Sequence, residues 1–208
     1  MAEFTERQKE IIEHALRLIA AHGIEKLTYR NMAIDLGITE PAFYRHFGNK
    51  TEILMGILVR FDGLRKQLFR DIRTQITDSL KAIEAIFTKH LGLFQNNPAL
   101  VTLLFPEEIR QGRKELEAKV QEMMSFGVQQ ITAMIDEGIE RSQIRQDIDP
   151  QQLALMISGS LRLIVRRWRL NGYPDDLENQ GARFWQTLST LIRGPEILPA
   201  SEINHLCT

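Results

Sequence analysis

Residues 28–50 constrain the fold more than any other part of the sequence, because they cannot form one long helix. Gly37 and Gly48 can each end a helix, since glycine tolerates the positive φ that follows many helix C-termini. Thr28 and Thr39 can each cap the start of a helix with a side-chain oxygen. The pattern predicts a short helix on each side of Gly37, joined by the few residues around the sequence GIT.

The rest of the chain shows helical periodicity almost throughout. Apolar residues recur every three or four positions over about 5–22. Asn49 with Glu52 resembles a capping box for a long helix that begins at Lys50 and reaches the seventies. Further helices are predicted at about 80–95, after Pro98, after Pro106, and over 113–141, 149–171 and 175–193. The sequence shows no alternating strand pattern, so the predicted fold class is all-α.

The second of the two short helices has a polar surface. A helix of about two turns cannot anchor a layer of a bundle alone. Phe43 and Phe47 can be buried toward the preceding helix, whereas Tyr44, Arg45 and His46 remain outside. Side chains of these three types bond phosphates and base edges. The two helices therefore favour a DNA-binding helix-turn-helix over an ordinary pair of bundle helices.

Lys50 is unusual because a cation in the first turn of a helix opposes the helix dipole. An anion docked there would reverse that penalty, and a phosphate would meet free backbone N–H groups together with the ammonium. Thr28 offers a similar helix start with a hydroxyl group. Each residue alone has an ordinary explanation, as a cap or a solvated charge, but their combination with the short helices favours contacts to DNA phosphates.

The stretch LTYRNMAIDLGITEPAFYRHFGNKTEIL resembles the N-terminal domain of the TetR/AcrR family of bacterial regulators. The resemblance covers about the first fifty-five residues and rests on the family spacing of Gly37, Phe43, Tyr44, His46, Phe47 and Lys50. Beyond them only the helical layout is similar. The resemblance implies a three-helix DNA-binding domain over 1–55, a larger helical ligand-binding and dimerisation domain over 56–195, and a tail over 196–208.

The resemblance also implies roles for individual residues of the helix-turn-helix. Four positions fall where family members contact the phosphate backbone: Thr28, Tyr44, His46 and Lys50. Six positions fall where base edges are approached or read: Arg30, Thr39, Glu40, Pro41, Ala42 and Arg45. Arg30 or Arg45 can bond guanine, whereas Glu40 either accepts from cytosine or serves the helix N-terminus, and we favour the second role.

The same resemblance implies a ligand pocket among the middle helices and a dimer formed by the last two long helices. The candidates for the pocket are Phe87, His90, Phe94, Leu104, Met123 and Phe126. The candidates for the dimer interface are Leu153, Ile157, Leu161, Ile164, Trp168, Trp185 and Leu188. The alternative for both sets is burial in the core of one subunit.

Composition excludes several classes of protein. Lys and Arg total 26 and Asp and Glu total 27, so the net charge favours neither a nucleic acid nor a membrane as partner. The single cysteine, Cys207, excludes an internal disulfide and a multi-cysteine metal site and fits a reducing compartment. No stretch approaches the length of a membrane span, and the first residues lack the features of a signal peptide. We expect a cytoplasmic protein.

Enzyme activity is not expected. Carboxylate di-iron proteins use Glu-x-x-His pairs on facing helices, and this spacing occurs at Glu202 and His205, after Pro199. One pair cannot build such a site. The sequence also lacks a Gly-rich phosphate loop and a G-x-S-x-G nucleophile motif. We therefore expect no catalytic residues, no metal and no cofactor.

Two basic runs have alternative interpretations. The run from Arg162 to Arg169 can bind an anion or a second nucleic acid, or it can form ion pairs with Asp175, Asp176 and Glu178 of its own or the partner chain, which we favour. The stretch from Arg60 to Arg73 can lie on a membrane surface, or it can link the two domains with its charges solvated, which we favour.

The predicted function is that of a homodimeric repressor on a palindromic DNA operator, released by a small apolar effector. The alternative is a DNA-bound module of the same family that a protein partner controls. An apolar cavity in the middle domain would favour the effector, and a well-packed domain would favour the partner.

Overall fold

The computed structural model describes residues 4–105, 112–174 and 176–193. Within these ranges the chain forms helices joined by loops, with no strand beyond one isolated bridge between Ile144 and Arg193. The helices are α1 (Glu6–His22), the 3-10 turn η1 (Ile24–Lys26), α2 (Tyr29–Leu36), α3 (Glu40–Tyr44), α4 (Lys50–Gln75), α5 (Ser79–Gln95), α6 (Pro98–Leu104), α7 (Lys114–Glu140), α8 (Pro150–Leu170) and α9 (Leu177–Ile192). The all-α prediction is confirmed. The helix expected after Pro106 and the tail over 196–208 lie outside the described residues.

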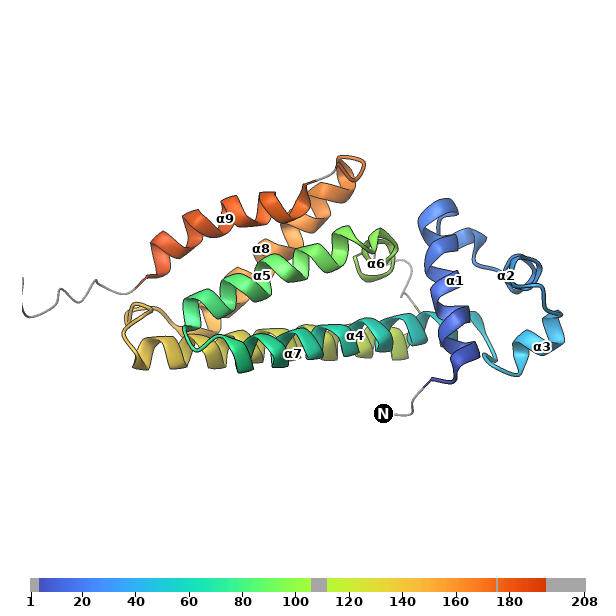
Figure 1. Cartoon of the computed structure of the whole chain (residues 1–208), viewed down its shortest axis with the longest axis horizontal. Helices are drawn as coiled ribbons and strands as arrows, with labels where there is room; N and C mark the ends of the chain where they lie inside the picture. The colour runs from blue at the N-terminus through green and yellow to red at the C-terminus, as the bar shows by residue number, and fades with distance from the viewer. Residues whose placement is uncertain (1–3, 106–111, 175, 194–208) are drawn as a thin grey trace, which may run out of the picture.

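The helices form a small N-terminal unit and a longer helical body (Figure 1). Helices α1, α2 and α3 lie together at one end of the molecule. From there α4 runs along the body, where it packs against α5 and α7. Helix α5 also packs against α9, and α7 packs against α8. The long helix α4 therefore belongs to both parts of the molecule.

The predicted caps are present at the starts of the N-terminal helices. The Thr28 hydroxyl oxygen accepts from the Asn31 backbone N–H at 3.2 Å, and that of Thr39 accepts from the Ala42 N–H at 3.3 Å. Gly37 ends α2 with a φ of +64°, a conformation that glycine adopts without the strain of a Cβ atom. The local signals therefore fix where these helices begin and where α2 ends.

Two local details differ from the sequence-based prediction. Helix α3 ends at Tyr44 rather than near Gly48, because the His46 and Phe47 N–H groups both bond to the Phe43 carbonyl and close a turn. The carboxylate of Glu52 accepts from the Gly48 N–H at 2.7 Å, which is one residue earlier than the capping box requires. Both changes tighten the connection between α3 and α4.

The basic stretch along α4 is not solvated as predicted. Arg60 bonds Glu13 of α1 at 2.6 Å, and Arg73 bonds Glu137 of α7 at 2.5 Å. Further along the helix, Asp62 is buried and attracts cations from α4 and α7. The charges of α4 therefore tie it to its neighbouring helices. The other half of the prediction, that this stretch links the N-terminal unit to the body, agrees with the fold.

Candidate functional site

The buried side of the helix-turn-helix holds α3 in place. Phe43 and Phe47 are both buried, as predicted. The ring of Tyr29 lies between Phe43 and Tyr44, with centroid distances of 4.8 and 4.4 Å, and its hydroxyl donates to the Phe47 carbonyl at 3.2 Å. Burial, followed by the proximity of Tyr44 and Glu52, raises the pKa of Tyr29 to about 12, so the hydroxyl remains a donor. The sequence left Tyr29 unassigned, although it anchors this surface.

The residues predicted to contact DNA lie on one short, polar stretch. Ala42, His46 and Lys50 are partly exposed, and the others are exposed: Thr28, Arg30, Thr39, Glu40, Pro41, Tyr44 and Arg45. They come from the starts of α2 and α4 and from the α3 region between them. Helix N-termini bind phosphates through their free N–H groups, and side chains between them can reach a groove.

Lys50 is held more firmly than a solvated lysine. Its ammonium donates to the Ile24 carbonyl at 2.9 Å. Burial lowers the pKa of Lys50, and the carboxylate of Glu25 partly offsets that effect. An ammonium has three N–H donors, so two remain for another acceptor. The contact therefore holds the ammonium beside η1 and leaves it N–H donors for a further acceptor.

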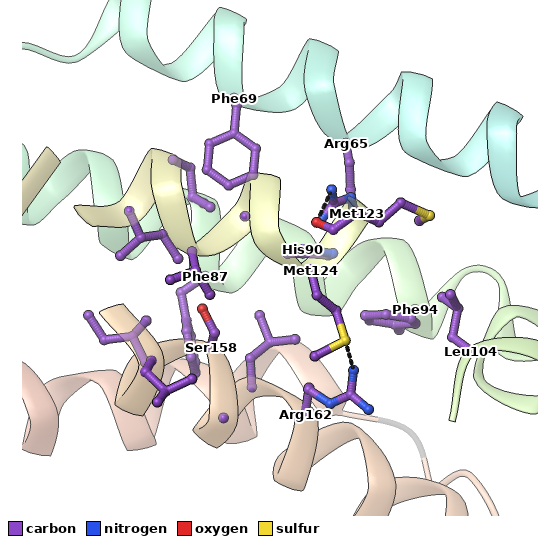
Figure 2. Close-up of a pocket in the computed structure, with 18 of the residues that line it drawn as sticks. Arg65, Phe69, Phe87, His90, Phe94, Leu104, Met123, Met124, Ser158 and Arg162 are labelled. Atoms are coloured by element: carbon purple, nitrogen blue, oxygen red, sulfur yellow. Dashed lines mark hydrogen bonds between the residues drawn. The ribbon is translucent and has the colours of Figure 1, made fainter. Parts of the chain in front are cut away.

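A largely apolar pocket of about 160 Å³ lies among α4, α5, α7 and α8 (Figure 2). Five of the predicted pocket residues line it: Phe87, His90, Phe94, Leu104 and Met123. Phe126 does not. Its ring packs edge-on against Phe69 at 5.8 Å and lies beneath the cations of Arg65 and Lys66. The prediction for Phe126 is therefore corrected: it belongs to the seam between α4 and α7.

Sequence reasoning missed the α4 and α8 walls of the pocket. Helix α4 contributes Phe61, Arg65 and Phe69, and α8 contributes residues that include Gly159 and Arg162. The α4 residues were assigned to a linker because their side chains alternate between basic and apolar. The small Gly127 and Gly159 leave space that a larger side chain would fill, and this was the available signal.

Polar groups enter the pocket from three helices (Figure 2). Arg65 reaches in from α4 and donates to the Met123 carbonyl at 2.8 Å. Burial, followed by the positive charge of Arg65, lowers the pKa of His90 to about 3, so the imidazole is neutral near pH 7. On α8 the Arg162 guanidinium contacts the Met124 sulfur at 3.0 Å and lies over the Phe105 ring.

The dimer-interface prediction needs correction. Leu153, Ile157, Trp168, Trp185 and Leu188 are buried within the single chain, which leaves little of their side chains to meet a partner. Only Leu161 and Ile164 of the predicted set are partly exposed, and Leu161 lines the pocket. The exposed apolar residues of these two helices are instead Leu155, Met156, Leu163, Leu170 and Leu191.

The ion pairs favoured for the Arg162 to Arg169 run involve Asp175, which lies outside the described residues, together with Asp176 and Glu178. Asp176 lies 3.7 Å from Arg183 of α9 instead. Arg166 and Arg167 are exposed, and Arg162 lies at the pocket.

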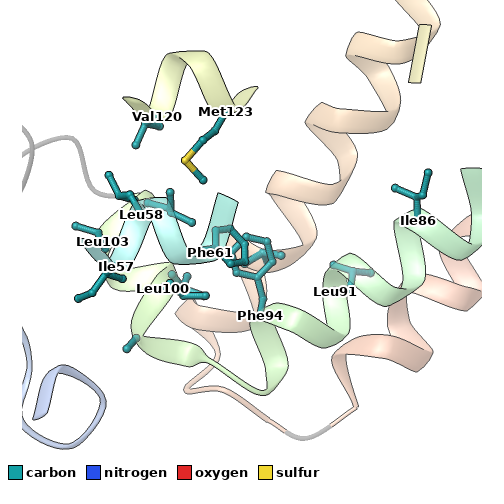
Figure 3. Close-up of a cluster of buried hydrophobic side chains, with 14 of the residues drawn as sticks. Ile57, Leu58, Phe61, Ile86, Leu91, Phe94, Leu100, Leu103, Val120 and Met123 are labelled. Carbon is teal, nitrogen blue, oxygen red and sulfur yellow. The ribbon is translucent and has the colours of Figure 1, made fainter. Parts of the chain in front are cut away.

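A compact core connects the pocket to the N-terminal unit (Figure 3). Phe61 of α4 packs against Phe94 of α5 at 5.5 Å, and Leu100 and Leu103 of α6 belong to the same buried cluster. Helix α6 in turn packs against α1. Helices α5, α6 and α1 therefore form a continuous packed connection from the pocket to the N-terminal unit.

Over the ranges that the structure describes, no group of three or more His, Cys, Asp or Glu residues is placed to hold a metal ion. Glu202 and His205 lie outside those ranges. None of the described helices has the length and apolar character needed to cross a membrane.

The short exposed α3, the two capped helix starts beside it and the separate helical body define a DNA-binding transcription regulator. A sequence model described as "Bacterial regulatory proteins, tetR family" matches residues 11–56, and one described as "YsiA-like protein, C-terminal region" matches residues 61–190. The chain belongs to the TetR family, whose members are transcription regulators rather than enzymes.

Relatives within this family resemble the chain over most of its length. The fatty acid metabolism regulator protein of Bacillus subtilis is 28% identical over 171 residues, covering 81% of this chain and 86% of that protein. The structure of the B. subtilis regulator FadR in complex with stearoyl-CoA has a TM-score of 0.75 and 23% identity, covering 89% of this chain and 98% of that chain. The ketosteroid transcriptional regulator KstR2 of Mycobacterium tuberculosis has a TM-score of 0.74 and 21% identity, covering 92% and 97%. The two structures share the fold.

Proposed function

We propose that the chain is a homodimeric transcriptional repressor that binds a palindromic operator and leaves it when a small apolar molecule fills the pocket. The observation that carries this proposal is the combination of an exposed helix-turn-helix with an apolar pocket in a separate helical body. Residues 1–55 form the DNA-binding domain, and residues 56–195 form the regulatory and dimerisation domain. The protein acts in the cytoplasm, where it meets chromosomal DNA.

The proposed phosphate contacts surround α3. Thr28 uses its oxygen to accept from Asn31 and keeps its hydroxyl proton for a phosphate. Lys50 keeps two N–H donors, and Tyr44 and His46 lie between these two helix starts. Base readout falls to Arg30, Thr39, Glu40, Pro41, Ala42 and Arg45. The exposed guanidiniums suit guanine, and the small exposed surface of Ala42 and Pro41 suits a thymine methyl group.

The DNA proposal is tested by titrating the purified chain against labelled DNA from upstream of its own gene, with scrambled DNA as the control. We expect sequence-preferring binding that weakens steeply as salt rises, because phosphate contacts release counterions. A footprint is expected to show two half-sites about one helical turn or more apart. Equal binding to both DNAs would contradict the proposal.

The dimer is proposed to form through the outward faces of α8 and α9. Met156, Leu163 and Leu170 are 62%, 59% and 75% exposed and lie seven residues apart along one side of α8. Leu191 of α9 is 62% exposed. A soluble single chain seldom displays such an apolar row, and a twofold axis would let the same row from a second copy cover it.

Leu163→Glu tests this interface, because a buried charge facing its own copy would separate the subunits. We expect the mass measured by light scattering to fall to that of one chain and operator binding to weaken. Leu64→Glu is the matched control, since Leu64 is a half-exposed leucine on α4 away from this face. A dimer that survives Leu163→Glu would place the interface elsewhere.

The pocket supports a small apolar effector rather than a protein partner as the controlling signal. Its aromatic lining, including Phe61, Phe87 and Phe94, suits an alkyl or fused-ring compound. Two relatives carry names that refer to fatty acid metabolism and ketosteroids. Such compounds, offered as free acids and as acyl thioesters, are therefore the first effectors to test.

The effector is sought by adding these compounds to the preformed DNA complex. Release at micromolar concentration by at least one class, without loss of the folded state, is expected. Filling the pocket by Gly127→Leu should abolish that release and leave DNA binding intact, because Gly127 lines the pocket. Release that persists in Gly127→Leu would show that the effector binds at another place.

A further inference from the structure

The pocket contains a buried hydrogen-bond donor with nothing to donate to. The Arg65 side chain is 7% exposed. Its Nη2 donates to Asp62 at 3.2 Å and to the Met123 carbonyl at 2.8 Å. Its Nε is fully buried and has no hydrogen-bond partner among the described residues. Leaving a charged group's N–H unpaired in an apolar site is costly, so this atom marks a place where an acceptor is missing.

The charge around Arg65 is also unbalanced. Asp62 is shared between Arg65, Lys66 at 2.7 Å and Lys119 at 2.8 Å. Glu122 is the second carboxylate of the cluster, at 3.0 Å from Lys119. Among the described residues of this cluster, three cations therefore face two carboxylates, and Arg65 is the cluster's cation on the pocket wall. Burial lowers the pKa of Arg65, although its proximity to Asp62 acts in the opposite direction.

The shape of the pocket determines how an acceptor would reach Arg65. On the opposite side, Met124, Leu155 and Gly159 are pocket residues that remain exposed, which places the mouth between α7 and α8. Arg65 comes from α4, across the pocket (Figure 2). A molecule entering at the mouth must therefore cross the aromatic lining before it meets the arginine.

We propose that the effector is an apolar monocarboxylate that enters with its carboxylate foremost and accepts a hydrogen bond from Arg65 Nε. This inference rests on the proposed function and names the chemical class of its effector. The carboxylate supplies the missing acceptor and the missing negative charge together. His90 lines the same pocket as a neutral imidazole and offers one further N–H.

The surroundings of the mouth favour a free acid over a polyanionic thioester. The polar groove next to the mouth shares Val120, Met124 and Val128 with the pocket. Its polar lining residues are Glu117, Gln121, Ser125, Gln129 and Gln151, and the charged one among them is an acid. Among the described residues this groove contributes no cation, and Arg162, which contacts Met124, is one cation on this side of the pocket. The volume of about 160 Å³ is close to that of an engineered apolar cavity of about 150 Å³ that takes up benzene.

The ligand side of the proposal is tested by calorimetry on the full chain without DNA. The probes are octanoate, methyl octanoate, octan-1-ol and octanoyl-CoA, which share one chain length. Octanoate is expected to bind roughly 10- to 100-fold more tightly than the ester and the alcohol, because only the carboxylate pairs with a buried charge. Octanoyl-CoA is expected to bind no more tightly than the ester. Equal affinity for acid and ester, or tightest binding of the thioester, would overturn the proposal.

The protein side is tested by Arg65→Lys, which keeps the charge beside Asp62 but has no Nε–H. We expect octanoate affinity to fall about tenfold, with methyl octanoate unchanged. Arg70→Gln is the control, since Arg70 is an exposed cation on the same helix. Equal losses for acid and ester would indicate a general packing defect and would contradict a specific anchor.

Arginine Nε–H resonances give a measurement that does not depend on a variant folding. Adding octanoate to the wild-type chain is expected to shift one buried Nε–H signal, and methyl octanoate is not. An unchanged spectrum with bound octanoate would refute the contact. If instead the acid preference holds but octanoate fails to release operator DNA, the anchor stands and the repressor proposal fails.

Discussion

The helix-turn-helix and the pocket are built in opposite ways. Between Thr28 and Lys50 a single short segment supplies its own caps, its own aromatic packing and its exposed side chains. The pocket instead takes its walls from α4, α5, α7 and α8, which lie far apart in the sequence. The helix-turn-helix can therefore be predicted from residues that are close in the sequence. The pocket instead depends on how the long helices pack against one another. Helix α4 is the element that they share.

The largest effect on stability is expected from Phe43→Ala. This variant tests whether the helix-turn-helix and the pocket fold separately. Phe43 is completely buried, and its truncation should cost about 3–5 kcal/mol. We expect backbone amides of α2 and α3 to lose protection in hydrogen exchange and DNA binding to disappear. Amides of α5 and α7 should stay protected, because α3 packs mainly against α2.

Ile34→Ala is the control for that experiment, since Ile34 is 68% exposed on α2 and its truncation should change stability by less than about 0.5 kcal/mol. Uniform loss of protection across α5 and α7 in Phe43→Ala would show that the molecule is one cooperative unit. The helix-turn-helix would then be local in its geometry, but it would not fold independently of the helices that form the pocket.

Asp62→Asn should have the next largest effect, on the side of the pocket. Burial raises the pKa of Asp62, but hydrogen bonds from Lys119 and Lys66 outweigh this and hold the pKa below its usual range. Removing the charge leaves the buried Arg65 guanidinium without its carboxylate partner, so we expect a loss of about 3 kcal/mol in urea unfolding at pH 7. The exposed Asp71→Asn on the same helix should change little. Equal stability of both variants would show that water already screens this cluster.

The sequence predicted the local site better than the assembled one for physical reasons. Caps at Thr28 and Thr39 and the turn at Gly37 depend on residues three or four positions away, so they can be read directly. The early end of α3 depends on hydrogen bonds to one carbonyl, and the packing of Tyr29 depends on a ring from α3. Neither leaves a sequence signal.

In the helical body, the periodicity of the sequence indicated which helix faces are apolar. It did not indicate which other helices cover those faces. Trp168 and Trp185 are on apolar faces, yet these faces pack inside the chain, and the exposed row through Leu163 lies on another side of α8. Arg65 resembled a solvated linker residue because its burial depends on α7. Helical spacing gives the direction in which a side chain points from the axis of its own helix. Whether that side faces the interior depends on how the other helices pack.

A change of pH is expected to have a smaller effect on the free energy of unfolding, through His90 in the pocket. Burial lowers the pKa of His90 to about 3, whereas an unfolded histidine titrates near 6.5. The unfolded state therefore binds the proton more readily, so stability is complete above pH 6.5 and falls as pH drops toward 3. Between pH 7 and pH 5 the loss is about 2 kcal/mol.

His90→Phe should flatten this part of the stability curve in urea unfolding, because it removes the titrating group but keeps a ring beside Phe94. The exposed His22→Phe is the control and should leave the slope unchanged. A slope that survives in His90→Phe would assign the pH dependence to another group.

The smallest effect is expected from Lys50→Gln, which changes DNA binding by the helix-turn-helix. The variant loses one cation at the start of α4, so the slope of log binding constant against log salt should fall by about 1 for each subunit on DNA. Binding should weaken by a similar factor on every sequence, since a phosphate contact carries no base information. Lys26→Gln, an exposed cation in η1, is the control. A Lys50→Gln variant that changed sequence preference instead would place Lys50 at a base edge, and its contact with the Ile24 carbonyl would then direct the ammonium into the groove rather than at the backbone.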